Sequence, residues 1–93
     1  MPRILIVGAG GIGGLTLDLI VPALEKVKQK SSITIMDGDT VEESNLGHQR
    51  FSTSDIGFFK TDALTKKYDQ FKHVYCVPDT DNLRFKEQLQ DFD

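Results

Sequence analysis

The sequence lacks the features of several large classes of protein. Cys76 is the only cysteine among 93 residues, which excludes an intramolecular disulfide and a zinc site built from several cysteines. No apolar run approaches the length that crosses a bilayer. The strand pattern begins directly after Met1, which leaves no room for a signal peptide. We therefore expect a cytoplasmic protein without membrane contact.

The charged residues show no stripe of one sign. Eleven basic and 14 acidic side chains give a net charge of −3, and the basic ones are dispersed, so we expect no nucleic-acid partner. A hydrophobic content of 39% with 27% charged residues is typical of a globular chain. The length supports at most one small domain, which we place over residues 1–93.

Three short apolar runs predict strands at residues 3–7, 32–36 and 73–77. The first is a continuous run rich in β-branched residues that ends at a glycine, which is typical of a strand buried on both faces.

Three helices are expected at residues 12–28, 62–71 and 82–92, the first kinked by Pro22, which cannot donate a backbone hydrogen bond. The order β-α-β-α-β-α predicts right-handed crossovers and a short parallel sheet in an α/β protein. This order resembles the first half of a doubly wound, three-layer Rossmann-like fold.

A glycine-rich turn follows the first predicted strand and opens the first helix. Gly8 permits the tight turn, Gly10 lets a phosphate approach the backbone, and Gly13 lets the helix pack closely on the sheet. Asp37, at the end of the second strand, is placed to accept hydrogen bonds from a ribose hydroxyl. The pattern favours nucleotide binding over a purely structural turn, but it does not choose between NAD and ATP.

A dense block of polar residues follows Asp37. A cation such as Lys60 can neutralise charge on a triphosphate, and amide side chains can orient phosphate oxygens. A dinucleotide oxidoreductase has no need of such a block, so its presence favours ATP. The block comprises Asp37, Asp39, Asn45, Gln49, Arg50 and Lys60.

Three motifs carry a family resemblance. The chain has G-A-G-G-I-G at residues 8–13, D-G-D-T-V-E-E-S-N-L-G-H-Q at residues 37–49 and D-I-G-F-F-K at residues 55–60. These resemble the signatures G-x-G-G-x-G, D-x-D-x-V-x-x-S-N-L-x-R-Q and D-I-G-x-x-K of the ubiquitin-activating-enzyme-like adenylyltransferases, the ThiF/MoeB group. The resemblance extends over residues 4–60.

Members of this family use ATP to adenylylate the C-terminal carboxylate of a small ubiquitin-like or sulfur-carrier protein, and they work as dimers. The resemblance implies that Asp37 holds the ribose and that Asn45 and Lys60 contact the phosphates, with Lys60 stabilising charge during attack on the α-phosphorus. Catalytic roles fall to Lys60 and Arg50. The implied nucleotide-binding residues are Gly8, Gly10, Gly11, Gly13, Asp37, Asp39, Asn45, His48, Gln49 and Lys60.

The chain departs from the family at His48, where the signature has a phosphate-binding Arg. A neutral imidazole donates one hydrogen bond where Arg offers a charged fork, so triphosphate binding should be weaker. Arg50 is two residues further on and can substitute if the loop shifts, since alternate residues of an extended segment share a side.

The sequence D-T-D-N at residues 79–82 resembles the family's D-x-x-D-N motif, which carries its metal-binding catalytic Asp. Only 18 residues separate Lys60 from Asp79, enough for one helix and one strand, whereas the family motif closes the next strand along. We therefore interpret Asp81 and Asn82 as the cap of the third helix. On this interpretation the sheet is truncated, and the ligand for the implied Mg²⁺ lies outside the chain.

The sequence thus predicts the N-terminal part of one ATP-binding domain of an adenylyltransferase, able to bind adenine nucleotide but unable to complete adenylylation alone. Two alternatives stay open: the cofactor-binding half of an NAD(P)-dependent oxidoreductase, and a non-enzymatic interaction module that keeps the nucleotide fold.

Overall fold

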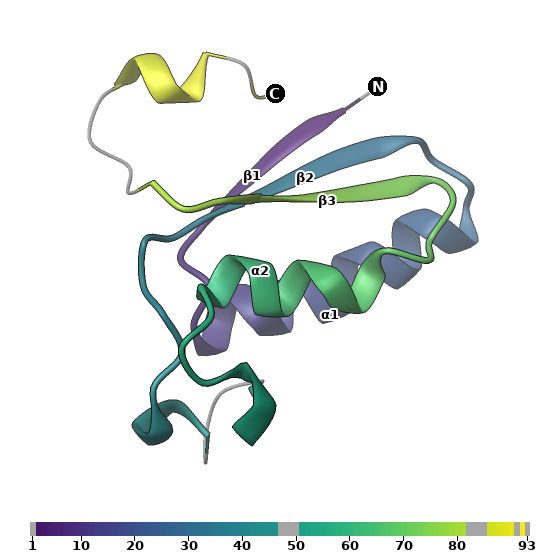
Figure 1. Ribbon diagram of the computed structural model, residues 1–93. Helices are drawn as coiled ribbons and strands as arrows, with labels where there is room; N and C mark the ends of the chain where they lie inside the picture. The colour runs from purple at the N-terminus through teal and green to yellow at the C-terminus, as the bar shows by residue number, and fades with distance from the viewer. Residues whose placement is uncertain (1, 47–50, 82–85, 91, 93) are drawn as a thin grey trace.

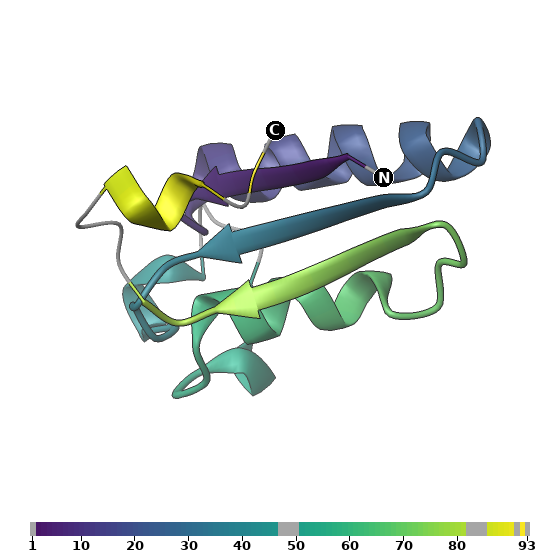
Figure 2. The same ribbon diagram turned by 90° about the horizontal axis from the view of Figure 1, so that it is seen from above.

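A computed structural model describes residues 2–46, 51–81, 86–90 and 92 of the chain. Within them, the strands β1 (Arg3–Val7), β2 (Ser31–Met36) and β3 (Val74–Asp79) form a parallel sheet of order β1-β2-β3. Val7 pairs with Met36, and Met36 with Asp79, so the strands end level with one another. Their arrowheads point the same way in Figure 2. The predicted α/β class and parallel sheet are confirmed.

The helices α1 (Gly11–Lys26) and α2 (Lys60–Thr65) lie on the same face of the sheet (Figure 1). The 3-10 helix η3 (Lys66–Tyr68) continues α2, and a second 3-10 helix, η4 (Lys86–Leu89), lies over the opposite face. This arrangement follows from right-handed crossovers, because two successive crossovers in one direction leave their helices on one side of a parallel sheet.

The core lies between β2 and the two helices. Ile33 and Ile35 alternate along β2 toward the helices and are fully buried, and Leu17 and Val21, one helical turn apart, cover them from α1. From the other helix, Ala63 and Leu64 close the layer, so that the central strand is the best covered of the three.

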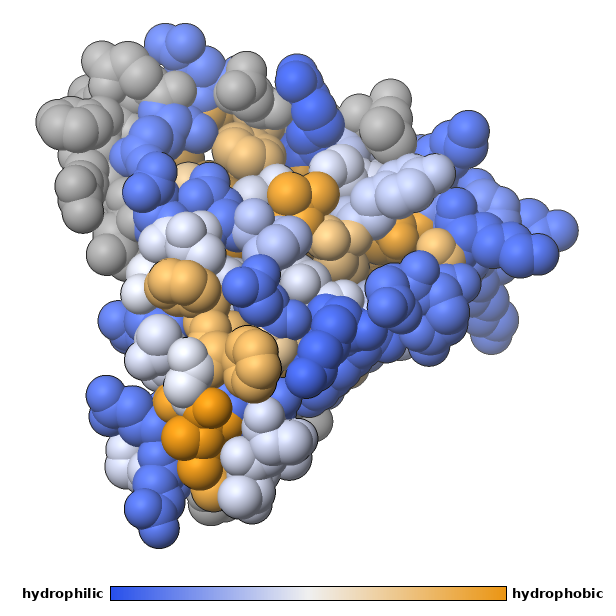
Figure 3. Space-filling model, in the orientation of Figure 1, coloured by the Kyte–Doolittle hydropathy of each residue, from blue (hydrophilic) through white to orange (hydrophobic). Residues whose placement is uncertain are grey.

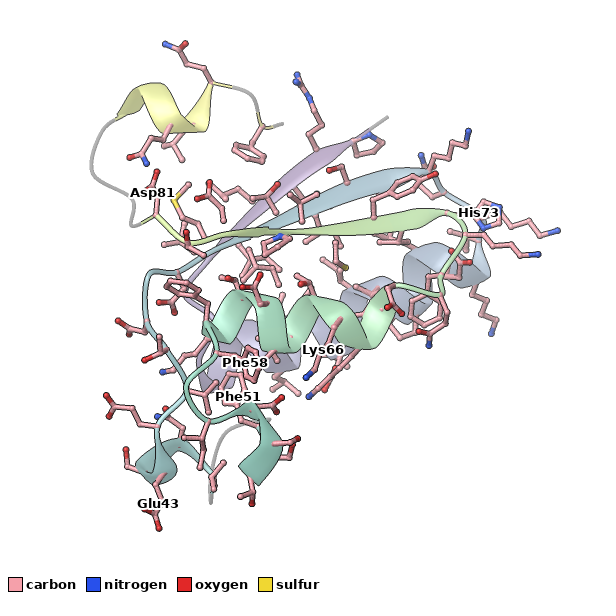
Figure 4. The ribbon with its side chains drawn as sticks, viewed as in Figure 1. Glu43, Phe51, Phe58, Lys66, His73 and Asp81 are labelled. Atoms are coloured by element: carbon pink, nitrogen blue, oxygen red, sulfur yellow. The ribbon has the colours of Figure 1, made fainter. Side chains whose placement is uncertain are left out.

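Two side-chain contacts hold the helical layer together and tie it to the segment before β3. The Tyr68 hydroxyl donates to the carboxylate of Asp18, which links η3 to α1. Glu25, near the end of α1, accepts the backbone N–H groups of Lys72 and His73, each at 2.8 Å. His73 lies at the edge of the molecule away from the strand ends (Figure 4), so this second contact fixes the start of β3.

The observed elements differ from the predicted ones at several ends. The helix α1 is continuous through Pro22 and spans Gly11–Lys26 rather than residues 12–28. The second helix begins at Lys60 rather than residue 62 and turns 3-10 after Thr65. Of the third predicted helix, the described part is the 3-10 helix η4. Among the described residues, no helix is both long enough and apolar enough to cross a membrane.

Candidate functional site

The glycine turn joins β1 to α1 at the edge where the strands end. Gly8 has a φ of 94°, a left-handed conformation that L side chains rarely adopt. A Cβ atom on Gly13 would stand 1.9 Å from the carbonyl oxygen of Gly8, so only glycine permits this approach of helix to turn. The φ of Gly8 fits its predicted role in a tight turn, and the close approach at Gly13 is to the backbone of that turn.

The first turn of α1 is open to an anion. Gly10 occupies the N-cap without a side-chain hydrogen bond, and no acidic residue lies in the first turn. Free N–H groups and the positive end of the helix dipole therefore face outward, which is the arrangement that binds phosphate elsewhere. A shallow hollow of about 620 Å³ borders this turn and is lined by Ile6, Val7, Gly8, Gly10, Gly11, Gly13 and Thr16.

Asp37 connects the glycine turn to the end of β2. Its Oδ2 accepts the N–H of Ala9 at 2.7 Å, and its Oδ1 accepts the N–H of Asp39 at 2.8 Å. Its own N–H donates to the carbonyl of Asp79 at 2.9 Å, which ties it to the end of β3 as well. The side chain is half-buried. Its hydrogen bonds place it between the glycine turn and the polar loop that follows.

The loop between β2 and α2, residues 37–59, is closed at its base by backbone hydrogen bonds. The N–H of Val41 donates to Phe58 at 2.8 Å, the N–H of Gly57 to Val41 at 3.0 Å and the N–H of Lys60 to Asp39 at 2.9 Å. An antiparallel bridge pairs Thr40 with Phe59. These bonds place Lys60, the first residue of α2, beside Asp39 although 21 positions separate them in the sequence.

A polar cavity of about 340 Å³ lies at this base. Its walls bring together residues that the sequence predicted as a group, with three that it did not. The lining residues are Gly38, Asp39, Thr40, Glu42, Asn45 and Lys60.

Lys60 and Asn45 offer hydrogen-bond donors to the cavity. Lys60 is only 9% exposed, and no hydrogen bond or ion pair joins its ammonium to another described residue. The Oδ1 of Asn45 accepts the N–H of Glu42 at 2.8 Å, in the capping box of the 3-10 helix η1 (Glu43–Asn45). This bond commits the oxygen of the amide and leaves its NH₂ group as the free end.

Asp55 anchors the outer part of the loop. In the capping box of the 3-10 helix η2 (Thr53–Asp55), its Oδ2 accepts the N–H of Ser52 at 2.8 Å, and its Oδ1 pairs with the Lys66 ammonium at 3.0 Å. Burial alone would raise the pKa of Asp55, but the hydrogen bonds from Ser52 and Lys66 outweigh it and lower the pKa below its ordinary value.

Beside this anchor, the loop exposes apolar side chains. Ile56 and Phe58 are 42% and 59% exposed, and the space-filling view shows apolar side chains at the surface of this part of the molecule (Figure 3). The Lys66 ammonium lies 5.9 Å from the centre of the Phe58 ring, and Figure 4 shows the two side chains near each other.

The structure therefore gathers the predicted residues into two groups. Gly8, Gly10, Gly11 and Gly13 surround the open start of α1, and Asp39, Asn45 and Lys60 line the polar cavity, with Asp37 between them. His48, Gln49 and Arg50 lie outside the described residues.

The sequence did not predict that Gly38, Thr40 and Glu42 line the cavity. It also did not predict the hydrogen bond from the N–H of Ala9 to Asp37. The last contact follows from the strand register: once Val7 pairs with Met36, the two residues after each strand lie side by side.

The described part of the chain contains no group of three or more His, Cys, Asp or Glu side chains that could hold a metal ion. Cys76, half-buried on β3, is separate from both groups, and burial raises the pKa of its thiol to about 11. The thiol is therefore protonated at neutral pH.

The parallel sheet, the glycine turn and the helix that starts from it define a Rossmann-like α/β protein. The profile of the ThiF family matches residues 1–87, and the chain belongs to that family. An adenylyltransferase and sulfurtransferase UBA4 from Yarrowia lipolytica is 39% identical over 64 residues, which is 69% of this chain and 15% of that protein. The UBA4 of Eremothecium gossypii is 38% identical over 77 residues, covering 80% and 16%.

Solved structures agree on the fold. The crystal structure of E. coli MccB with ATP superimposes with a TM-score of 0.70 and 25% identity, covering 97% of this chain and 26% of that chain. The E. coli tRNA N6-threonylcarbamoyladenosine dehydratase TcdA gives a TM-score of 0.73 at 22% identity, a likeness of fold alone, covering 97% and 36%. The chain thus spans about one-sixth of the length of the curated relatives it matches.

Proposed function

We propose that the chain binds ATP between the glycine turn and the polar cavity, as the N-terminal part of a domain that adenylylates the C-terminal carboxylate of a small ubiquitin-like or sulfur-carrier protein. Membership of the ThiF family and the adenylyltransferase names of the UBA4 relatives support this activity. The ATP in the MccB structure supports the choice of nucleotide.

The observation that carries the proposal is the state of Lys60. The residue is 9% exposed and lines the polar cavity, and no ion pair joins its ammonium to another described residue, so the positive charge is available to an anion that enters the cavity. The cavity that Lys60 lines is wide enough to admit phosphate groups.

The chemistry that these residues can perform is positioning and charge neutralisation. The ammonium of Lys60 neutralises negative charge on the phosphates, the NH₂ group of Asn45 donates to a phosphate oxygen, and the open N–H groups of α1 receive a second phosphate. Attack of a carboxylate on the α-phosphorus then needs little covalent work from the protein. The ligand of the Mg²⁺ that the family implies is proposed to lie outside this chain.

Asp39 and Glu42 line the same cavity as Lys60. Their carboxylates repel a bare triphosphate, so the site should prefer ATP with its charge partly neutralised. A helix N-terminus that binds anions without nearby carboxylates would show no such preference for ATP with neutralised charge.

Lys60→Met tests the proposed ATP site. Loss of a charge-assisted hydrogen bond to the phosphates should weaken ATP binding by roughly tenfold or more, measured by isothermal titration calorimetry. Lys30→Met is the matched control, because Lys30 is exposed and precedes β2, at the far end of the strand from the cavity. Equal ATP affinity in both variants would sink the proposal.

NAD is the alternative ligand for the same fold. If ATP and NADH compete and ATP binds more tightly, the adenylyltransferase assignment stands; the reverse order would favour the cofactor half of an oxidoreductase. A folded chain that binds neither nucleotide would be an interaction module.

We propose that the chain holds only part of the catalytic site. Mixed with ATP, Mg²⁺ and a carrier protein, it should release no pyrophosphate. Pyrophosphate release by this same chain would show the site to be complete.

We also propose that the protein forms a homodimer. Among the described strands, β1 pairs only with β2, which leaves its other edge open, and Val7 at its end is 53% exposed. Light scattering coupled to size-exclusion chromatography should report twice the monomer mass, and a monomer at all concentrations would contradict this.

A further inference from the structure

The carboxylate of Asp37 is already engaged by the protein on both of its oxygens. The N–H of Ala9, in the glycine turn, occupies Oδ2, and the N–H of Asp39, at the mouth of the polar cavity, occupies Oδ1. At 2.7 and 2.8 Å, both are within the range of charge-assisted hydrogen bonds. One side chain therefore joins the two halves of the proposed nucleotide site.

We infer that Asp37 is a positioning residue, which holds the glycine turn and the polar loop in the geometry that receives the phosphates, in addition to any contact with ribose. The inference rests on the proposed nucleotide site. It goes beyond a ribose contact because it assigns Asp37 an effect on groups of the ligand that it does not touch.

The remaining contacts around Asp37 explain why its side chain is needed there. The turn has one further backbone tie to β2, from the N–H of Gly8 to the carbonyl of Met36 at 2.8 Å. That bond fixes the end of β1 but leaves the N–H of Ala9 to the carboxylate. Asp39, in turn, accepts the N–H of Lys60 through its carbonyl, so the bond from Asp37 to Asp39 extends to the residue that bears the cavity's ammonium.

Inorganic tripolyphosphate separates the positioning role from a ribose contact, because it has no ribose. Asp37→Asn leaves one oxygen and replaces the other with an NH₂ group, so it can accept only one of the two N–H groups. The positioning role predicts that Asp37→Asn weakens both tripolyphosphate and ATP by roughly tenfold.

A ribose contact alone predicts the opposite for tripolyphosphate. Removing a negative charge near a polyanion should leave its binding unchanged or tighten it, while ATP binding weakens. Asp81→Asn is the charge-matched control: Asp81 is exposed near the same edge of the sheet, and its described contact to Asp79 uses its backbone N–H. Unchanged or tighter tripolyphosphate binding in Asp37→Asn would overturn the inference.

Amide hydrogen exchange of the nucleotide-free chain gives a readout that needs no ligand. In Asp37→Asn, the N–H of Ala9 or of Asp39 should exchange at least tenfold faster, while the N–H of Gly14, which bonds to the carbonyl of Gly10 at 2.8 Å, should keep its rate. Unchanged exchange at both amides would overturn the inference. If the wild-type chain binds neither ligand, the proposed function fails, and the exchange rates still decide the role of Asp37.

Asp37→Glu keeps the net charge and both oxygens but moves them by one methylene, so it serves if the Asn variant does not fold. Weaker tripolyphosphate binding with faster exchange at Ala9 supports the positioning role. Wild-type values for both would contradict it, because the exact placement of the carboxylate would then not matter.

Discussion

Gly13 and Gly8 touch so closely that a single added methyl group would collide with the backbone: the Cβ of an alanine at 13 would lie 1.9 Å from the Gly8 carbonyl oxygen. The obstacle is main chain rather than the end of a flexible side chain, so α1 or the turn must move to relieve it.

Gly13→Ala should therefore lower the free energy of unfolding by about 2–3 kcal/mol. Gly11→Ala is the matched control, because nothing lies within 4 Å of its added Cβ and alanine favours the helix; it should be neutral or stabilising by up to about 1 kcal/mol. Urea denaturation measures both variants, and equal destabilisation would contradict the contact.

The Asp55 carboxylate should make the free energy of unfolding depend on pH. Because its folded pKa is lowered, its contribution is fully present above the unfolded pKa of about 3.9 and is lost as the pH falls through the folded value. Asp55→Ala should reduce the free energy of unfolding by about 1–2 kcal/mol at pH 7, and the difference from wild type should shrink below about pH 4. A difference that does not shrink as the pH falls below about 4 would contradict this account.

Lys66→Ala should have a smaller effect than Asp55→Ala. The Lys66 side chain is 58% exposed, so its ion pair is screened by water, and its removal should lower the free energy of unfolding by less than about 1 kcal/mol. The capping bond from Ser52 to Asp55 is unaffected by this change. If Lys66→Ala were the more destabilising variant in denaturant titrations, the ion pair rather than the cap would be the anchor.

Tyr68→Phe should weaken the contact between η3 and α1. It removes the hydroxyl that donates to Asp18 and should lower the free energy of unfolding by about 1–3 kcal/mol, as for hydrogen bonds to charged groups. Tyr75→Phe makes the same chemical change at a side chain that is 53% exposed, and it should stay within about 0.5 kcal/mol of wild type. Thermal unfolding of the pair checks the difference.

Cys76 should react slowly with iodoacetamide. With a pKa of about 11, its thiolate fraction at pH 7.5 is roughly a hundredfold or more below that of a free cysteine with a pKa near 8.5. Alkylation of the folded chain should be slower by that order, and denaturant should restore the ordinary rate. Fast labelling of the folded protein would show that β3 opens at Cys76.

The strands were the most predictable part of the fold, since continuous apolar runs gave their positions. The end of β3 was misjudged because Pro78 interrupts the apolar pattern, whereas the strand continues to Asp79. Among the described strands, β3 pairs only with β2, so it is an edge strand, where proline is tolerated because a missing N–H need not break the ladder.

Contacts between residues far apart in the sequence limited how much of the site could be predicted. The motif residues predicted that Asp39, Asn45 and Lys60 act together, and the three line one cavity. The start of α2 at Lys60 depends on the bond between its N–H and Asp39, which local sequence patterns do not contain. Parallel register, rather than composition, brings Ala9 to Asp37.

The backbone bonds that close the base of the loop also separate two kinds of sequence change. Val41 and Phe58 are joined directly, so the described residues between them, 42–46 and 51–57, leave and re-enter the fold at one fixed point. Substitutions at exposed positions beyond that point, such as Ile56, alter the surface, whereas Asn45 lines the cavity and Asp55 is buried in its capping box. Exposed positions such as Ile56 therefore tolerate change, while the bond between the N–H of Lys60 and Asp39 holds the start of α2 in place.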